Sequence, residues 1–419
     1  MIDGFDNIVI GQAAPVLATL WGAPKSAFGP VFGAGLFGMM VGAFGLGPIA
    51  DCKGRKAVLI VCTIMFSLFS LATVWVDSIN ELIALRFVAG LGLGGAVPCA
   101  IALTSEFCPR RNRALLVAIL TCGTPLGGML TGIVALFVMP AYGWKGMFIL
   151  GGVLPLLFLS LMFTWLPDSV KYMALRGDRQ GTIALILRKV SPDEDLTNTR
   201  FVSQGVSRAT RGPVGSLFAG GAWKGTVSLW VTNLCNLLVI YFFTNWLPTL
   251  ATALHVEGAG VHGSALSSIY LAGITIGSIS IGLLMRRHVA GVLVMCSIGL
   301  SAIFLLGLGA FVSSPVIAAL MVFGVGLGTG GTGAGVNAVA ATFYPTEARA
   351  TGISWVLALG RIGSIIGSLM GGILLAANVG LSAQFQGLVL PMVVGTAVMF
   401  GMRHYGEVRM RGKPASQAH

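Results

Sequence analysis

The 419-residue chain is 55% hydrophobic and only 10% charged, and its mean hydropathy is +0.89. Soluble domains carry about 25% charged residues, so this composition excludes a soluble protein and indicates many membrane spans. A net charge of +12 would suggest a nucleic-acid partner in a soluble protein, but here the basic residues sort by membrane side and no such partner is expected. The seven cysteines lack metal-ligand spacing, and we expect neither a metal nor a cofactor.

Twelve apolar stretches approach or exceed the roughly 20 residues that a helix needs to cross a bilayer. Six precede a polar stretch, at 2–21, 27–50, 57–77, 80–107, 113–139 and 144–166. Six follow it, at 224–250, 263–285, 289–312, 315–343, 349–376 and 384–403. An even number of spans puts both ends of the chain on one side of the membrane.

The basic residues identify that side. Most of the 26 lysines and arginines fall in alternate loops, in the polar stretch and after the last span, whereas the opposite loops carry only Lys25 and Lys145. Loops rich in lysine and arginine stay in the cytoplasm. Both termini and the polar middle loop are therefore predicted to be cytoplasmic.

The two sets of spans repeat one another. The fourth and tenth spans each contain a glycine-rich run, and a proline follows each run at the ends of 92–109 and 328–345. Arg113 and Arg349 each follow that proline by four residues. The offset between the copies is 236 residues. Two similar six-helix sets are typical of secondary transporters whose site lies between the halves. The predicted fold is an all-α membrane protein with 12 transmembrane helices in two pseudo-symmetric halves.

The predicted division of the chain follows from this repeat. The N-terminal half is 1–166, the cytoplasmic middle loop is 167–222, the C-terminal half is 223–404 and the cytoplasmic tail is 405–419.

The first span carries two acids in apolar sequence. Asp3 and Asp6 are three residues apart, so in a helix they share one face. A carboxylate in the bilayer core is costly and usually faces a protein interior or a water-filled path. Two carboxylates on one face also repel, so one of them is a candidate proton carrier. The alternative is that both lie at the cytoplasmic membrane edge and only cap the helix.

The loop between the second and third spans reads GPIADCKGRK over 47–56. It resembles the G-x-x-x-D-R-x-G-R-R/K loop of the major facilitator superfamily, and the resemblance implies a cytoplasmic gate. The matching residues are Gly47, Asp51, Gly54, Arg55 and Lys56, while Cys52 stands where an arginine is usual. The alternative is that these basic residues serve only membrane topology.

Partners for this predicted gate lie elsewhere in the sequence. Arg55 is expected to pair with Glu106 at the inner end of the fourth span. Asp51 is expected to lie at the start of the eleventh span near Arg349, where the helix dipole favours an anion. Arg113 is counted in the same gate.

Four stretches resemble the aromatic acid:proton symporters within this superfamily. They are Asp3-Gly-Phe-Asp6 and the patterns over 86–113, 245–250 and 344–363, and they cover both halves in order. The resemblance implies a monomeric importer of small aromatic carboxylates in the bacterial inner membrane, driven by protons through Asp3 and Asp6. Members of that family usually have additional residues before the first motif, so we expect a segment upstream of Met1.

Candidate substrate-binding residues lie in three spans. Arg361 falls near the middle of the eleventh span, where a guanidinium suits a carboxylate, or alternatively pairs with a neighbouring helix. Arg86 is a second candidate, which could instead snorkel to the outer surface. Asn245 could donate a hydrogen bond and Trp246 could stack on an aromatic ring, although Trp246 could equally anchor the membrane interface.

Other functions stay open. The chain could be a symporter or antiporter for another organic anion, a sugar or a drug, or a membrane receptor that binds aromatic acids without transport. An enzyme is not expected, because the sequence shows no nucleophile–base constellation, metal cluster or phosphate-binding loop.

Overall fold

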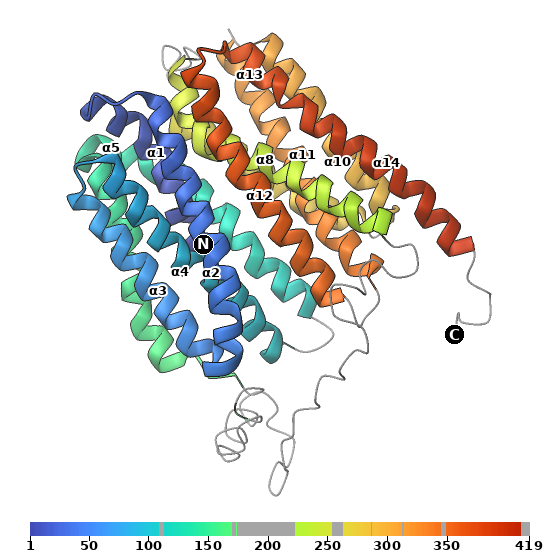
Figure 1. Cartoon of the computed structure of the whole chain (residues 1–419), viewed down its shortest axis with the longest axis horizontal. Helices are drawn as coiled ribbons and strands as arrows, with labels where there is room; N and C mark the ends of the chain where they lie inside the picture. Colours follow the sequence, from blue (N-terminus) through green and yellow to red (C-terminus); the bar gives the residue numbers. More distant parts are fainter. Residues whose placement is uncertain are drawn as a thin grey trace, which may run out of the picture. The chain divides into compact units, whose positions relative to one another are not determined.

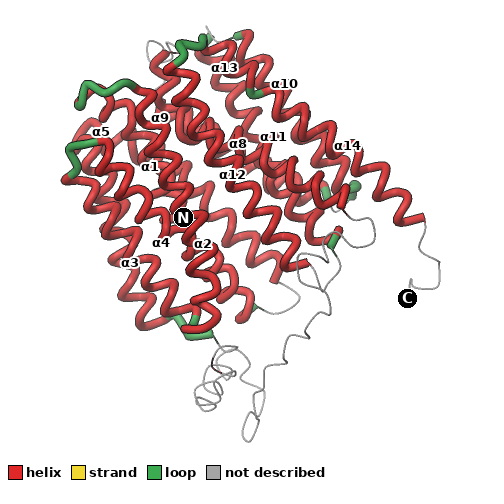
Figure 2. Tube along the Cα trace, in the orientation of Figure 1, coloured by secondary structure: helices red, strands yellow, loops and turns green. Residues whose placement is uncertain are grey.

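A computed structural model describes residues 1–108, 113–169, 173, 223–253, 263–285, 287–311, 314–344 and 349–411 (Figure 1). These residues form helices joined by short loops, and no strand occurs among them (Figure 2). The long helices are α1 (Ile2–Leu20), α2 (Phe28–Lys53), α3 (Arg55–Ala72), α4 (Ile79–Phe107), α5 (Arg113–Trp165), α8 (Trp223–Ala253), α9 (Gly263–Leu284), α10 (Ala290–Ala310), α11 (Pro315–Phe343), α12 (Arg349–Ala376) and α14 (Val389–Arg411). The short ones are η1 (Lys25–Ala27), η2 (Thr73–Trp75) and α13 (Leu381–Gly387).

The number of long helices agrees with the sequence. Ten candidate membrane spans occur among the described residues, and one of them, Leu120–Trp165, is two helices that meet at Gly143, with φ 65° and ψ −171°. Together with α1, which carries the two acids, these make the twelve expected helices. The prediction of an all-α membrane protein is confirmed, because helices satisfy the backbone hydrogen bonds that lipid cannot.

Local sequence explains where two of the helices begin. Ser78 caps α4, because its hydroxyl accepts a hydrogen bond of 3.3 Å from the backbone N–H of Glu81. Pro315 opens α11, at the position where a missing N–H costs nothing.

The last span differs from its prediction. The short α13 precedes it, and α14 continues to Arg411, beyond the expected end at 403. The predicted middle loop, 167–222, lies outside the described residues except for 167–169 and Met173, and so do residues 412–419.

Glycines set the closest helix packing, and they do so twice. A Cβ on Gly90 or Gly94 of α4 would collide with the backbone of α2, and one on Gly326 or Gly330 of α11 would collide with the backbone of α9. Glycines let membrane helices approach this closely. The two pairs of glycines are related by the 236-residue offset, so this part of the predicted repeat is confirmed.

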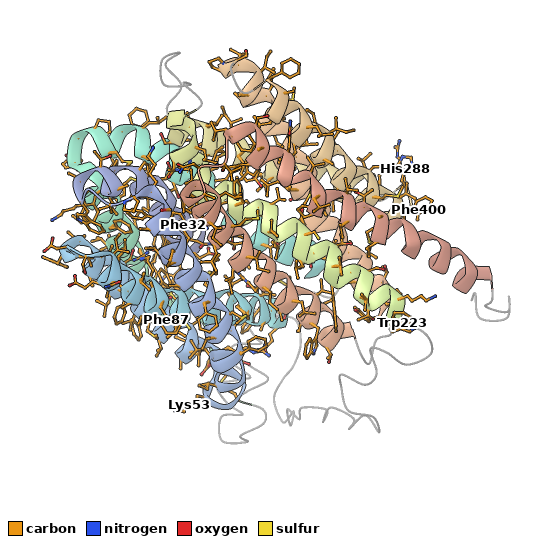
Figure 3. The ribbon with its side chains drawn as sticks, turned by 45° about the horizontal axis from the view of Figure 1, so that its top comes forward. Phe32, Lys53, Phe87, Trp223, His288 and Phe400 are labelled. Atoms are coloured by element: carbon orange, nitrogen blue, oxygen red, sulfur yellow. The ribbon has the colours of Figure 1, made fainter. Side chains whose placement is uncertain are left out.

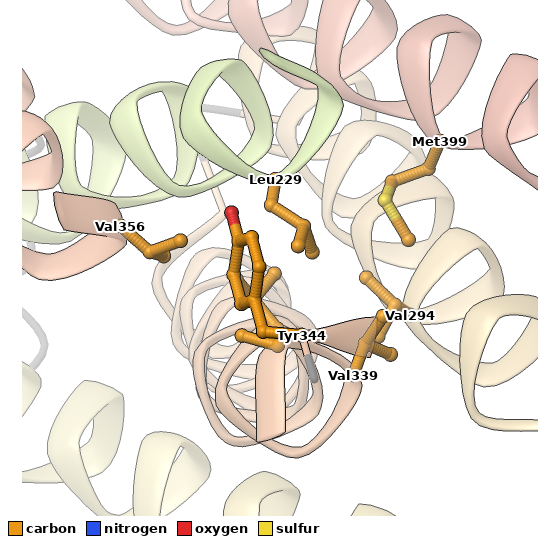
Figure 4. Packing of buried hydrophobic residues seen from close by; sticks show 8 residues of the cluster. Leu229, Val294, Val339, Tyr344, Val356 and Met399 are labelled. Carbon is orange, nitrogen blue, oxygen red and sulfur yellow. The ribbon is translucent and has the colours of Figure 1, made fainter. Parts of the chain in front are cut away.

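One apolar cluster fixes the helices of the C-terminal part. Its side chains come from α8, α10, α11, α12 and α14 and gather around Tyr344 (Figure 4). They are Leu229, Val294, Val336, Val339, Ala340, Tyr344, Val356 and Met399. In contrast, Trp223 and Phe400 are exposed on their helices (Figure 3), as lipid-facing side chains of a membrane protein are.

The chain divides into two compact units. Unit 1 comprises Met1–Asn7, Ala34–Gly127 and Tyr142–Arg208, and unit 2 comprises Ile8–Gly33, Gly128–Ala141 and Ala209–His419. Most of α1, the start of α2 and the middle of α5 thus belong to unit 2. The boundaries of the halves proposed from the sequence stay predictions.

Candidate functional site

A buried charge pair occupies the interior of unit 1. Asp6 of α1 is 1% exposed and Arg86 of α4 is 4% exposed, and the Oδ2 atom of Asp6 lies 3.7 Å from the Nη1 atom of Arg86. The hydroxyl of Ser70 on α3 donates a hydrogen bond to Oδ1 of Asp6. Three helices therefore meet at one carboxylate. The inward position of Arg86 rules out the alternative that it snorkels to the membrane surface.

Arg86 is held by more than its carboxylate partner. Its Nη2 atom donates to the hydroxyl of Thr73 at 2.7 Å and to the carbonyl of Phe69 at 3.5 Å. Its guanidinium carbon lies 5.1 Å from the centre of the Phe148 ring, within the range of a cation–π contact. The guanidinium is therefore held by the segment Phe69–Thr73 and by Phe148 as well as by Asp6.

The second acid of the first helix has different surroundings. The Oδ2 atom of Asp3 accepts a hydrogen bond of 2.8 Å from the hydroxyl of Thr124 on α5, and the Asp3 side chain is 22% exposed. Asp3 and Asp6 are separated by one helical turn, yet they contact different helices. Asp6 is thus the more enclosed of the two proton-carrier candidates.

The predicted gate residues of unit 1 come together at the ends of α3 and α4. The Nη1 atom of Arg55 lies 2.5 Å from Oε1 of Glu106, so the expected ion pair is present. The other carboxylate oxygen of Glu106 accepts a hydrogen bond of 2.7 Å from the Ser169 hydroxyl. Lys56 donates to the carbonyl of Phe163 at 3.0 Å. Both basic residues thus tie the start of α3 to other parts of unit 1.

Gly54 makes the turn that brings Arg55 into place. Its φ is 97°, a left-handed value that strains any residue with a Cβ, and it is the single residue between α2 and α3. The glycine of the recognised loop motif therefore has a direct structural reason.

Three further predicted gate residues are described by their backbone alone. Asp51 lies in the last turns of α2, Arg113 begins α5 and Arg349 begins α12, but their side chains lie outside the described part of the chain.

The predicted substrate-binding residues of the C-terminal helices lie in unit 2. The Nη1 atom of Arg361 on α12 lies 3.3 Å from the Tyr241 hydroxyl on α8. Asn245 donates its amide Nδ2 to the Ser368 hydroxyl at 2.7 Å, and Trp246 donates its indole Nε1 to the Ser368 carbonyl at 2.8 Å. All three contacts join α8 to α12.

The Trp246 side chain is packed inside the protein and is not exposed at a surface. It has no exposed surface, and its ring meets that of Phe32 edge-on at 5.1 Å. The alternative that it anchors the membrane interface is therefore wrong.

Tyr241 is a residue that the sequence reasoning missed. The spacing of α8 contained the necessary clue, because Tyr241 lies four residues before Asn245 and so shares its helix face. Once Asn245 is assigned to the face toward α12, Tyr241 follows.

Comparisons with known proteins agree with this architecture. The family model described as Major Facilitator Superfamily matches residues 1–287 and 229–417. A gallate transporter of Pseudomonas putida is 36% identical over the whole chain and 92% of its own length. The 4-hydroxybenzoate transporter PcaK of Acinetobacter baylyi is 34% identical over 95% of the chain and 88% of its own length.

Solved structures support the fold. The xylose transporter XylE of E. coli, in its inward open conformation, superposes with a TM-score of 0.73 over 95% of this chain and 94% of XylE, at 16% identity. The full-length matches at more than 30% identity show more than a shared fold. The chain belongs to the major facilitator superfamily, and its full-length relatives there are named as transporters of gallate and of 4-hydroxybenzoate.

Proposed function

We propose that the chain imports small aromatic carboxylates together with protons by alternating access across the bacterial inner membrane, as a monomer with both termini in the cytoplasm. The observation that carries this proposal is the buried pair of Asp6 and Arg86. Ionisable side chains are costly inside a membrane span, and they commonly mark functional sites there. The substrate class is supported by the relatives, which are named as transporters of gallate and of 4-hydroxybenzoate. Like them, the chain is a transporter and not an enzyme.

Proton coupling in this proposal centres on Asp6. Protonation of its carboxylate removes the charge opposite Arg86, while Thr73 and Phe148 keep contact with the guanidinium. A change in charge at a site where α1, α3 and α4 meet alters how these helices hold one another. Asp3, held by Thr124, is the second candidate for proton transfer.

Substrate binding in this proposal centres on Arg361. A guanidinium in a membrane span needs an anion, and its planar fork fits a carboxylate in two-point contact. The Tyr241 hydroxyl beside it can accept from the guanidinium and donate to a substrate oxygen. Binding roles for Asn245, Trp246 and Arg86 stay predictions, since the first two now join α8 to α12 and the third contacts Asp6.

The cytoplasmic gate in this proposal is the Arg55–Glu106 pair. It must open and close once in each transport cycle. An ion pair with side chains that are 17% and 13% exposed can be opened at modest cost, because water reaches both charges. Lys56 and the Gly54 turn support the same segment.

Uptake of labelled 4-hydroxybenzoate, protocatechuate and gallate into cells that express the chain tests this function. Accumulation that collapses when a protonophore is added is the expected result. Binding without accumulation would instead indicate a receptor. Accumulation of sugars or uncharged drugs that does not depend on Arg361 would indicate another transporter of the superfamily.

A further inference from the structure

Unit 2 contains a cavity that the proposed transport cycle does not use. Its volume is about 510 Å³, and it is lined by the last turns of α1, by α5 just before Gly143, by the end of α8 and by the start of α9. Small-molecule sites in proteins have volumes of about 300–1,000 Å³. Neither Arg361 nor Tyr241 lines it. The cavity is therefore large enough for a ligand and distinct from the substrate site proposed at Arg361.

One wall residue of the cavity has an unused hydrogen-bond donor. Gln12 is 3% exposed, and its Nε2 atom has no hydrogen-bond partner among the described residues. A buried amide that donates no hydrogen bond is costly, and more so in a membrane span where no bulk water reaches it. The donor thus needs an acceptor that the described chain does not supply.

The other lining residues determine which acceptor fits. Pro15, Pro248 and Met139 contribute apolar walls, and the Thr19 hydroxyl already donates to the carbonyl of Pro15 at 3.0 Å. The described lining contains no acidic or basic side chain. A charged group would lie there without a counter-charge, so the interior favours an uncharged ring that carries a polar atom.

The cavity opens at one edge. Val16 is 38% exposed and Leu20 is 62% exposed, and both line it. The connections nearest to these lining segments are those of α1 with α2 and of α8 with α9, which the distribution of basic residues predicts to be outside the cell. A ligand at this edge can keep a charged group in water while its ring enters the cavity.

We propose that this cavity is a second, outer binding site for hydroxylated aromatic acids. The ring packs among the prolines, a ring hydroxyl accepts a hydrogen bond from Nε2 of Gln12, and the carboxylate remains in water at the open edge. The inference rests on the proposed function, because it assumes that aromatic acids are the substrates. The site favours acids with a ring hydroxyl over benzoate and raises their concentration at the outer surface.

Equilibrium dialysis of labelled 4-hydroxybenzoate and benzoate against the purified full chain in lipid nanodiscs tests this site. We expect two molecules of 4-hydroxybenzoate per chain, and one after Val16→Trp fills the cavity from its edge. Gln12→Leu should weaken the outer site for 4-hydroxybenzoate by roughly fivefold, the loss of one neutral hydrogen bond, and leave benzoate unchanged. Gln386→Leu, at an exposed glutamine of α13 outside the cavity, is the matched control.

The outcomes separate this inference from the proposed function. A folded Val16→Trp variant that still binds two molecules would overturn the outer site, and so would a single wild-type site that Arg361→Ala abolishes. A single wild-type site that depends on Arg361 is also the result expected if a lipid chain fills the cavity. If no aromatic acid is transported and no bound molecule depends on Arg361, the proposed function fails, whatever Val16→Trp does.

Discussion

Helices α4 and α11 are copies that share their packing and differ in their charge. Gly90 of α4 and Gly326 of α11 hold equivalent positions, and each lies against the backbone of a neighbouring helix. At the same offset of 236 residues, Arg86 corresponds to Val322, which is fully buried. The repeat therefore preserves the helix contacts, whereas the buried cation belongs to the first copy.

Helices α5 and α12 also differ in charge, but here the second copy carries the arginine. Their first residues, Arg113 and Arg349, are related by the same offset. By that offset, the residue of α5 that corresponds in sequence to Arg361 of α12 is Pro125. The first copy thus carries its central arginine on α4, and the second carries its own on α12. In the proposed function, this difference assigns proton binding to one set of helices and the substrate carboxylate to the other.

The largest expected effect is that of Asp6→Asn. An asparagine cannot lose or gain the proton, so we expect proton-driven accumulation of 4-hydroxybenzoate to be abolished while exchange of external for internal substrate continues. Uptake and exchange in proteoliposomes measure the two separately. Asp77→Asn, at an exposed position before α4, is the control. Retained accumulation in Asp6→Asn would remove Asp6 from the coupling mechanism.

Arg361→Ala should act on affinity. Loss of the charged partner of a bound carboxylate costs about 2–5 kcal/mol, which corresponds to a rise in KM of about 30-fold or more. Tyr241→Phe removes a single hydroxyl, and we expect only a several-fold rise, in line with about 1 kcal/mol for a neutral hydrogen bond. Initial rates of uptake against substrate concentration give both values. A KM equal to that of the wild type in Arg361→Ala would contradict its assigned role.

Matched valine substitutions test whether the two copies pack equally. Gly90→Val and Gly326→Val should each destabilise the protein by about 1–3 kcal/mol, since both force helix backbones apart. Thermal unfolding of the purified protein measures the shift in Tm. Gly282→Val, at a position with open space around it, should leave Tm unchanged. Unequal shifts for Gly90 and Gly326 would mean that the copies differ in packing as well as in charge.

Glu106→Gln is expected to have the smallest effect. It removes the charge opposite Arg55 but keeps the shape and the hydrogen bond to Ser169. A partly exposed ion pair contributes up to about 1 kcal/mol, so the ratio of exchange to net uptake should change by no more than about fivefold. Glu81→Gln, at the opposite end of α4, serves as the comparison. An unchanged ratio would show that the pair does not limit opening.

Periodicity and length were sufficient to predict most of the fold from the sequence. The ends of α3, α4, α9 and α11 fall within a few residues of the expected spans, because a bilayer sets the length of an apolar helix. The Arg55–Glu106 pair was also expected, since both residues lie at the same predicted membrane edge. The extension of α14 to Arg411 was not, because hydropathy shows where a span leaves the bilayer and not where its helix stops.

The contacts between helices were harder to predict. Asp6 and Arg86 were treated separately, because helix spacing determines which face a residue occupies but not which helix it meets. The general rule that buried opposite charges pair would have joined them. The same limit applies to Trp246, whose size suggested a ring-stacking surface although its indole is fixed to Ser368.

The two ion pairs of unit 1 both involve α4, and α3 contacts both of them. Arg55 and Ser70 both stand on α3, about 22 Å apart along its axis, and Glu106 and Arg86 both stand on α4. A lengthwise shift of α3 against α4 would therefore stretch the Arg55–Glu106 pair and, with Asp6 held at Arg86 of α4, move the Ser70 hydroxyl away from the Asp6 carboxylate in a single movement. The position of α3 along α4 therefore sets the contacts of Arg55 and of Ser70 at the same time.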